Sequence, residues 1–444
     1  MSRLHISIMA LTLGLMLSPG PPMICKDKGT PGKGISVRLE ALDSLRCWCS
    51  PLWGHNAPKI ARNKHGETWV AEFSGEYPEA TVQILKRGTS GSWQRGAAFK
   101  GAYQPSLLFL DAGGRLNVIQ NSQTKPILHF RSKDSQNLDN FEQVAEGNGQ
   151  EDGRGWYVGV GIHADTLYMA YITLSYDLFL TWKRLTDPVW NPPVTVHRGK
   201  VDTVKGNHSW TRPRFQFSGR HGLFVVNETS DGSVKNTYNK VQLVSFDLSD
   251  PRRFTTECVD SVPMGFGAYS CEFAVSPDGY LHCVFERNPR IYESGVAYTS
   301  EPGIYVASRP VSGGSWIKRR VFDVLTDGTL LSGADGSIVL LRLQRSGLSV
   351  NVDRLDSSTD QSAGSAAPVW VARRSADHGA TWSDVAVRSA PATLTTPSHI
   401  QAVTPSNGSF TGTHAEGLFE DSRGPLPGTK LGRYTLYYFI VDGD

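Results

Sequence analysis

Four residues that can move protons precede or begin short apolar segments of this 444-residue sequence: His55, Tyr103, Tyr157 and His208. Histidine and tyrosine side chains can hold or release a proton at a hydrogen-bonded site, as general acid–base catalysis requires. We therefore predict that these four residues are catalytic. The alternative for Tyr103 and Tyr157 is ordinary packing in the core, and for His55 it is the capping of a turn.

Residues suited to binding a sugar stand at the same segment starts and at the ends of the segments that follow. Aromatic rings can stack on sugar rings, and a few polar groups fix the orientation of a ligand. The predicted substrate-binding residues are Asn56, Asn121, Trp156, Arg212, Glu272 and Arg287.

A basic stretch surrounds His208 and Arg212. Between Val194 and His221, six lysine or arginine residues stand against one acidic residue, Asp202. Such a run is usually a solvated surface, but this one brackets a predicted segment start, where a positive field favours an anionic ligand. The charge therefore predicts a glycan that carries uronic or sialic acid.

A repeated pattern of elements decides where these candidates lie. A short apolar strand, a turn with glycine or aspartate and a second apolar strand recur seven times, at a spacing of about fifty residues. The copies span residues 57–71, 104–118, 157–170, 214–225, 272–282, 328–341 and 400–419. The 3.6-residue periodicity of helices is nearly absent.

Short strands with glycine-rich turns at this period predict an all-β fold, a seven-bladed β-propeller in which each unit forms one four-stranded blade. The last unit is one strand short. Residues 35–39 are predicted to supply that strand and close the ring, because an open ring would leave unpaired strand edges. A six-bladed, sialidase-type propeller is one alternative. Two β-sandwich domains are another, but they would need a linker near residue 200, where the sequence has none.

The octapeptide Ser375–Trp382 has the pattern S-x-D-x-G-x-T-W and follows a predicted strand. Its aspartate should accept hydrogen bonds from the turn's own backbone, its glycine should take a positive φ, and its tryptophan should pack between sheets. Residues 175–182 look like a degenerate copy, and residues 91–93 and 314–316 like eroded ones. The octapeptide resembles the Asp-box, or BNR repeat, of the sialidase superfamily of propellers, in which such turns lie between outer strands, away from the pocket.

The segment His55–Pro58 resembles the His-Asn-x-Pro start of BNR-repeat propellers that include ulvan lyases. The resemblance implies that His55 and Tyr103 transfer protons and that Tyr157 is a further site residue. Those lyases break a glycosidic bond by β-elimination at a uronic acid. A base removes the C5 proton, a cation or strong donors neutralise the carboxylate, and an acid protonates the leaving oxygen.

The sequence departs from both enzyme families at particular positions. Gln120 and Asn121 stand where these lyases have an arginine, so Asn121 or Arg212 is our hypothesis for the group that neutralises the carboxylate. A sialidase needs an arginine triad, to which Arg212 and Arg287 could contribute, but Asn56 stands where that family has its first arginine.

Composition and the chain termini set the remaining expectations. The 45 basic and 42 acidic residues give a net charge of +3, which argues against a dedicated nucleic-acid binder. Residues 1–24 predict a secretory signal peptide, because the apolar stretch 6–17 is too short to span a membrane. The mature chain is then a secreted protein, extracellular or periplasmic, with one propeller domain at 35–444. Six cysteines suit an oxidising compartment, in which Cys271 and Cys283 could form a cross-strand disulfide or stay reduced.

These observations predict a monomeric carbohydrate-active enzyme that cleaves an acidic polysaccharide or oligosaccharide by β-elimination, as a polysaccharide lyase. An exo-acting glycoside hydrolase of sialidase type and a non-catalytic glycan-binding propeller are the alternatives. A divalent cation, calcium or zinc, is left open as a cofactor. No nucleic-acid partner and no membrane span are expected.

Overall fold

The computed structural model describes most of the chain after residue 33. The described residues are 34–52, 58–121, 126–134, 138–150, 155–173, 177–202, 206–229, 239–262, 266–289, 303–323, 328–333, 335–345, 368–389, 394, 397–402 and 414–443. They belong to one compact unit, Lys33–Asp444, and their regular elements are all strands. Within these ranges no helix is long and apolar enough to cross a membrane. The predicted signal peptide at residues 1–24 lies outside them, and the predicted domain bounds stay a prediction.

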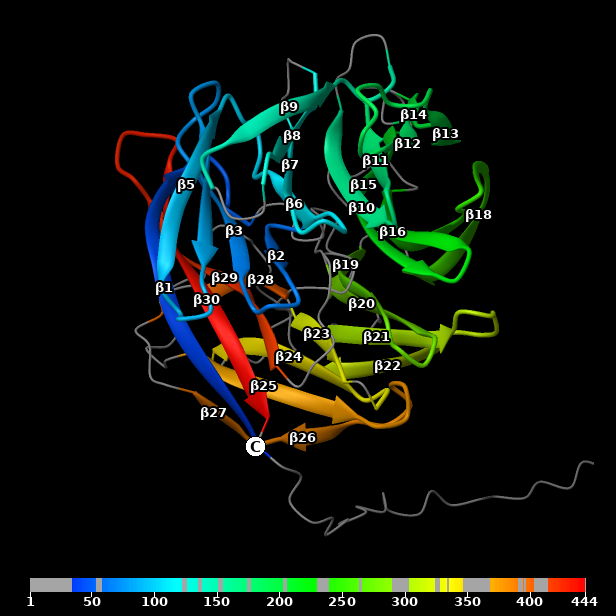
Figure 1. Ribbon diagram of the computed structural model, residues 1–444. Helices are drawn as coiled ribbons and strands as arrows, with labels where there is room; N and C mark the ends of the chain where they lie inside the picture. The colour runs from blue at the N-terminus through cyan, green and yellow to red at the C-terminus, as the bar shows by residue number, and fades with distance from the viewer. Residues whose placement is uncertain are drawn as a thin grey trace, which may run out of the picture. The chain divides into compact units, whose positions relative to one another are not determined.

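Seven small sheets form a seven-bladed β-propeller (Figure 1). Blade 1 contains β2 (Ile60–Arg62), β3 (Thr68–Ser74), β4 (Thr81–Arg87) and β5 (Trp93–Lys100). Blade 2 contains β6 (Leu107–Leu110), β7 (Leu116–Gln120), β8 (Leu128–Ser132) and β9 (Phe141–Glu146). Blade 3 contains β10 (Trp156–His163), β11 (Thr166–Ile172), β12 (Leu178–Arg184) and β13 (Val194–His197). Blade 4 contains β14 (Lys200–Asp202), β15 (Gly206–Ser218), β16 (His221–Thr229), β17 (Lys240–Asp247) and β18 (Asp250–Ser261).

The remaining three blades complete the ring. Blade 5 contains β19 (Phe266–Val275), β20 (Tyr280–Pro289), β21 (Gly303–Pro310) and β22 (Ile317–Phe322). Blade 6 contains β23 (Gly328–Ser332), β24 (Ile338–Arg345), β25 (Pro368–Ser375) and β26 (Ser383–Val385). Blade 7 contains β28 (Pro397–Ala402), β29 (His414–Pro425), β30 (Gly432–Gly443), β1 (Ile35–Cys47) and the short β27 (Val387–Ser389).

The predicted repeat is confirmed, because its seven copies are the hairpins formed by the innermost and second strands of the seven blades. Apolar side chains of β3, β7 and β11 are buried on both faces, since neighbouring blades cover both sides of each sheet. The six-bladed and the two-sandwich alternatives are wrong for this chain.

The N-terminal strand closes the ring, as predicted. Strand β1 pairs antiparallel with β30 from Ile35 opposite Gly443 to Cys47 opposite Gly432, and Figure 1 shows the two side by side. Val37 of β1 is only 2% exposed, so the strand contributes to the core as well as to the sheet. The first and last parts of the propeller are therefore joined in blade 7.

The propeller has two distinct ends, because the innermost and second strands within each blade run antiparallel. Each innermost strand begins at one end, which we call the start face, and the turn after it lies at the other end, which we call the turn face. Innermost strands of successive blades contact one another, including β2 with β6, β6 with β10 and β10 with β15. Residues just before these strands therefore gather at the start face.

Four innermost strands carry a β-bulge near their beginning. Each has one more residue than the stretch of second strand that it faces. The bulges fall between Trp156 and Gly159, Thr211 and Arg214, Ser270 and Glu272, and Ser398 and Gln401. Bulges re-aim side chains and are over-represented next to active sites. Inside them stand Tyr157, Arg212, Cys271 and His399.

The turn at Ser375–Trp382 has the internal hydrogen bonds that the sequence predicted. Asp377 accepts from the backbone N–H of Thr381 at 2.8 Å and from its hydroxyl at 2.6 Å. Gly379 has φ +87°, and Trp382 packs against the core between blades 5 and 6. The turn joins β25 to β26 at the turn face, away from the start face.

The degenerate copy at residues 175–182 is wrong as a prediction, because Thr181 and Trp182 lie inside strand β12 rather than in a turn. Asp177 instead accepts the backbone N–H of Gly199 at 2.7 Å and pairs with Arg198 at 3.1 Å. The eroded copies at 91–93 and 314–316 do lie where β4 meets β5 and β21 meets β22.

Of the two alternatives left open for Cys271 and Cys283, the structure has the reduced one, because Cys283 is a free, buried thiol. The turn between β19 and β20 sets a register in which Cys283 is opposite Phe273, so that the two cysteines do not face each other. Cys47 and Cys49 are also buried and free, and Cys47 donates to the carbonyl of Phe73, in agreement with a structural role.

Candidate active site

Tyr103 stands at the start face between β5 and β6, in a group of aromatic rings. Its ring centroid is 4.9 Å from that of Trp48 and 5.4 Å from that of Tyr77, the latter in an edge-to-face contact. Its backbone N–H donates to the carbonyl of Asn121, at the end of β7, at 2.9 Å. Strands of blades 1, 2 and 7 thus hold one phenol in place.

Tyr157 stands on the neighbouring blade 3. It stands in the bulge of β10 with φ +45°, a conformation that is rare for a bulky residue and costs about 1–3 kcal/mol. Such strain persists only where the surroundings impose it, and it concentrates at functional sites. The half-buried ring packs on the apolar cluster between blades 3 and 4.

Burial raises the pKa of the Tyr103 phenol, and the neighbouring Tyr157, Cys49 and Tyr77 raise it further. The catalytic roles of Tyr103 and Tyr157 stay predictions. Because its pKa is raised, Tyr103 is protonated at neutral pH and can donate a proton.

Asn121 forms hydrogen bonds with both Tyr103 and Gln104. It is only 2% exposed, and its amide donates to the side-chain oxygen of Gln104 at 3.2 Å. Since its backbone carbonyl also holds Tyr103, Asn121 orients two neighbouring residues of the site. One of the two N–H donors of its amide is engaged in this geometry, and its predicted role towards a substrate carboxylate stays a prediction.

The segment 48–52 joins β1 to the region that carries His55 and Asn56, which themselves lie outside the described residues. Glu420 of β29, 1% exposed, accepts the Ser50 hydroxyl at 2.6 Å and the Leu52 backbone N–H at 3.1 Å. This buried carboxylate fixes the segment immediately before His55.

Three further candidates have a described backbone but no described side chain. Trp156 begins β10 opposite Ile172, His208 lies in β15 opposite Lys200, and Arg212 occupies the bulge of the same strand. These positions are on the innermost strands of blades 3 and 4, on the start-face side of their bulges or within them.

Glu272 is a buried ion-pair partner in this structure. It is 1% exposed, pairs with Arg214 of blade 4 and accepts the hydroxyl of Thr329 of blade 6 at 3.2 Å. It therefore joins three innermost strands directly behind the bulge that carries Arg212. This placement gives Glu272 a positioning role, while its predicted contact with substrate stays a prediction.

Arg287 is also engaged with protein groups. Its guanidinium forms two hydrogen bonds with Asp260, at 2.7 and 3.0 Å, and lies 4.4 Å from the ring centroid of Tyr305. Lys318 adds a second cation at 2.9 Å from Asp260. The structure thus places Arg287 in a network between blades 4 and 5 and does not bring it to Tyr103.

Three of the six basic residues between Val194 and His221 have described side chains, and each of the three is paired with a carboxylate. Arg198 pairs with Asp177, Arg214 is buried against Glu272, and Arg220 pairs with Asp247 at the turn face. Among these three described arginines none contributes an unpaired positive charge to the start face.

Sequence reasoning missed Trp48 and Glu420 as parts of the site. Trp48 stands between two cysteines after a strand and gives no catalytic signal, and Glu420 acts through a partner 370 residues away. Within the described ranges, no three His, Cys, Asp or Glu side chains are grouped so that they could hold a metal ion.

The fold and these groups define an all-β, seven-bladed propeller with a tyrosine-centred site at its start face. No protein-family model matches the chain, and no curated protein matches it.

Among solved structures, the chain is similar to an ulvan lyase of polysaccharide lyase family PL25, with a TM-score of 0.58, 12% identity and coverage of 91% of this chain and 94% of that one. The structure described as that lyase bound to -[GlcA(1-4)Rha3S]- gives a TM-score of 0.57. Polysaccharide lyase Uly1 gives 0.56 at 10% identity, covering 87% and 90%. At these identities the likeness is one of fold.

Proposed function

We propose that this protein is a secreted polysaccharide lyase that cleaves a uronic-acid-containing polysaccharide by β-elimination. The observation that carries the proposal is the group of aromatic rings, Trp48 and Tyr77, that contacts the Tyr103 ring at the start face. Trp48 and Tyr77 offer ring surfaces for a sugar, and the phenols offer protons. The fold shared with ulvan lyases, one of them described with a glucuronate-containing saccharide, supports the same reaction class.

The reaction divides between a base and an acid. His55 is our candidate for the base that takes the C5 proton of the uronic acid. The electrons of that C–H bond form the C4–C5 double bond, and the bond from C4 to the leaving oxygen breaks. Tyr103, protonated because its pKa is raised, gives its proton to that oxygen.

The carboxylate of the substrate needs a positive partner, because removal of the C5 proton develops negative charge on it. We assign this role to Arg212, which stands in a bulge on the innermost strand of blade 4. Glu272 and Arg214 brace that bulge from behind and serve as positioning residues. His208 on the same strand is the remaining candidate for proton transfer.

The sialidase-type alternative is less well supported. It needs an arginine triad, and Arg287, one of its two candidate members, is held by Asp260 and lies over Tyr305. Most other hydrolases need two carboxylates flanking the scissile bond, whereas among the described residues the ring contacts of Tyr103 and the side-chain hydrogen bond of Asn121 are with an indole, a phenol and an amide.

Secretion and membership of the Asp-box propellers are parts of the same proposal. The basic and then apolar residues before 25 support export, and the hydrogen-bonded turn at Ser375–Trp382 supports membership of the Asp-box propellers. An exported enzyme of this class would meet polysaccharide outside the cell.

The test is incubation of the purified protein with uronate-containing polysaccharides, neutral polysaccharides and sialosides. A lyase produces an unsaturated uronate, detected by its new ultraviolet absorbance and by mass spectrometry, from uronate substrates alone. Release of reducing sugar without that absorbance would contradict the proposal and indicate a hydrolase. Binding without turnover would indicate a lectin.

A further inference from the structure

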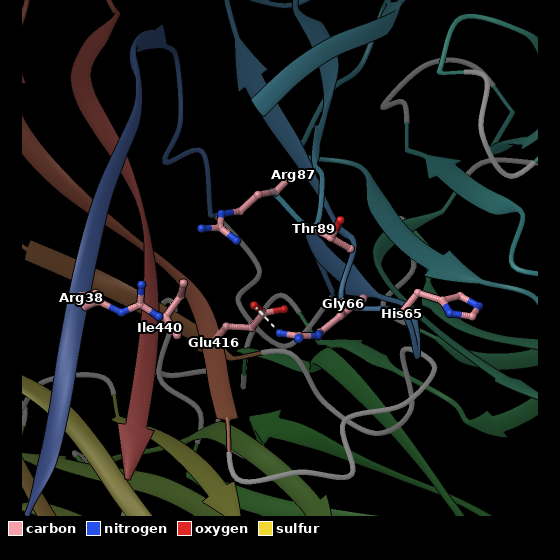
Figure 2. A pocket seen from close by; sticks show the side chains of 8 residues that line it. Arg38, His65, Gly66, Arg87, Thr89, Glu416 and Ile440 are labelled. Carbon is pink, nitrogen blue, oxygen red and sulfur yellow. Dashed lines mark ion pairs between the residues drawn. The ribbon is translucent and has the colours of Figure 1, made fainter. Parts of the chain in front are cut away.

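A groove lies between blades 7 and 1 at the turn face (Figure 2). Its volume is about 250 Å³, and its polar lining is Arg38, Arg62, Arg87, His65, Thr89 and Glu416. His65 and Thr89 belong to the turns after β2 and β4, whereas Tyr103 precedes β6. The groove and the candidate active site are therefore at opposite ends of the propeller.

The one carboxylate in the lining is already neutralised. Glu416 is buried, pairs with Arg62 at 2.7 Å, accepts the Thr68 hydroxyl at 2.8 Å and also accepts the hydroxyl of Tyr438. With its charge offset and its oxygens occupied, Glu416 supports Arg62 rather than repelling an anion.

Arg87 is held rigidly at the back of the groove. Its Nε and Nη2 donate to Glu40 at 3.1 and 2.7 Å, and its guanidinium carbon lies 5.3 Å from the ring centroid of Tyr438. Trp93 also donates to Glu40, at 2.9 Å. Since a guanidinium has five N–H donors, the edge of Arg87 that carries Nη1 remains for a ligand.

Arg38 stands at the mouth of the groove on β1. Its side chain is 62% exposed, and only its Nε donates to a carboxylate of the described chain, that of Asp442, at 2.9 Å. Both of its terminal nitrogens are thus directed to solvent or ligand. Figure 2 shows Arg38, Arg87 and Glu416 reaching toward one hollow from three different strands.

We propose that this groove is a second carbohydrate site, which binds a sugar unit bearing a carboxylate or a sulfate group. Planar guanidinium groups match such oxyanions in bidentate geometry, and here ion pairs and an aromatic ring fix two of them before a ligand arrives. The volume lies below the ~300–1,000 Å³ of sites for drug-sized ligands, which suits a single sugar ring. The identity of the polysaccharide rests on the proposed function, whereas the oxyanion chemistry does not.

Such a second site would tether the protein to its polysaccharide. A site at the turn face holds the protein on an acidic polysaccharide matrix while the start face works on a neighbouring chain. Two linked sites raise the effective concentration of substrate without any new contact at the reacting bond.

The experiment is calorimetric titration of the full-length mature protein with four probes: a glucuronate-containing oligosaccharide, a sulfated oligosaccharide, a neutral oligosaccharide of equal length and inorganic sulfate. Arg38→Ala is the main variant, because an exposed arginine contributes little to stability. Arg87→Lys keeps the charge but loses the planar fork. Arg252→Ala is the matched control, since Arg252 is 72% exposed and pairs through Nε with Asp250 at 2.7 Å on the far strand β18.

We expect one class of binding sites for the acidic probes to weaken at least about tenfold in Arg38→Ala and in Arg87→Lys, and not in Arg252→Ala. The acidic probe that binds more tightly identifies carboxylate or sulfate as the preferred group. Turnover of a short substrate should stay unchanged in the groove variants, and groove binding should persist in Tyr103→Phe. Equal binding by wild type and Arg38→Ala, equal weakening in Arg252→Ala, or equally tight binding of the neutral probe would overturn the proposal, whether or not the protein is a lyase.

Discussion

The pKa of the Tyr103 phenol depends on the residues around it. Burial and a second phenol, that of Tyr157, raise its pKa, so that it holds its proton through the neutral range. Tyr157 has a positive φ, and the Tyr103 ring contacts that of Trp48. Neither feature is visible in the sequence, because both depend on a bulge and on a strand from another blade.

Replacing Tyr103 with Phe removes the acidic proton and keeps the ring that packs on Trp48 and Tyr77. We expect kcat on a uronate polysaccharide to fall about 10²–10⁴-fold with KM and melting temperature nearly unchanged, because general acid catalysis is lost while binding surface remains. Steady-state kinetics and thermal unfolding measure this. Tyr280→Phe, at the beginning of β20, is the control; equal losses in both variants would contradict the assignment.

At the scale of elements, segment 48–52 links the closing strand β1 to the region of His55. Its position depends on one buried carboxylate, Glu420, which accepts the hydroxyl of Ser50. The bulges of β10 and β15 likewise determine the backbone positions of Tyr157 and Arg212. The site is thus built from the irregular ends of otherwise regular strands.

Ser50→Ala leaves one oxygen of Glu420 without its hydroxyl donor. We expect a loss of about 1–3 kcal/mol in stability and a fall of about ten- to a hundredfold in kcat/KM, because the segment before His55 becomes less well positioned. Ser44→Ala, exposed on β1, should change neither quantity. Full activity of Ser50→Ala, measured by the same kinetics and by denaturant unfolding, would show that the segment does not position the site.

Glu72 of β3 links the stability of blade 1 to pH. It is 1% exposed, and one of its oxygens has no hydrogen-bond partner among the described residues. Burial raises the pKa of this carboxyl to about 7; Asp43 also raises the pKa, and Arg95 lowers it. A carboxyl with a raised folded-state pKa stabilises the fold at low pH, and that stability is lost as pH rises through about 7.

Glu72→Gln should therefore match the wild type near pH 4 and exceed its stability near pH 8 by on the order of 2 kcal/mol. Denaturant unfolding at the two pH values measures the difference. Glu79→Gln, at an exposed position of the same blade, should show no such pH dependence. A Glu72→Gln variant that is less stable than the wild type near pH 8 would mean that the charged form is the one the fold requires.

For the whole molecule, the ring of seven blades could be predicted from the sequence, because the sequence signals for strands and turns are local. Strand alternation and turn residues repeat in every blade, so seven inner hairpins and the closing strand could be read without knowing any distant contact. The site was harder to predict, since Glu272 meets Arg214, and Arg287 meets Asp260, only after different blades pack together. The register of the β19–β20 hairpin likewise places Phe273, and not Cys271, opposite Cys283.

Closure by β1 should carry much of the global stability. Val37→Asp buries an unpaired charge opposite Val441 in blade 7, and we expect it to cost at least about 3 kcal/mol. Ala41→Asp, exposed on the same strand, should cost little. Thermal unfolding compares the two, and similar melting temperatures would mean that the ring does not depend on this strand.

The central claim is that the tyrosine site at the start face performs β-elimination. The most direct measurement is mass spectrometry of the products formed from a glucuronate-containing polysaccharide in water enriched in heavy oxygen, with wild type and Tyr103→Phe side by side. Our account predicts unsaturated uronate ends without solvent oxygen from the wild type and almost none from the variant. Incorporation of heavy oxygen at the new ends, or equal product from both proteins, would contradict it.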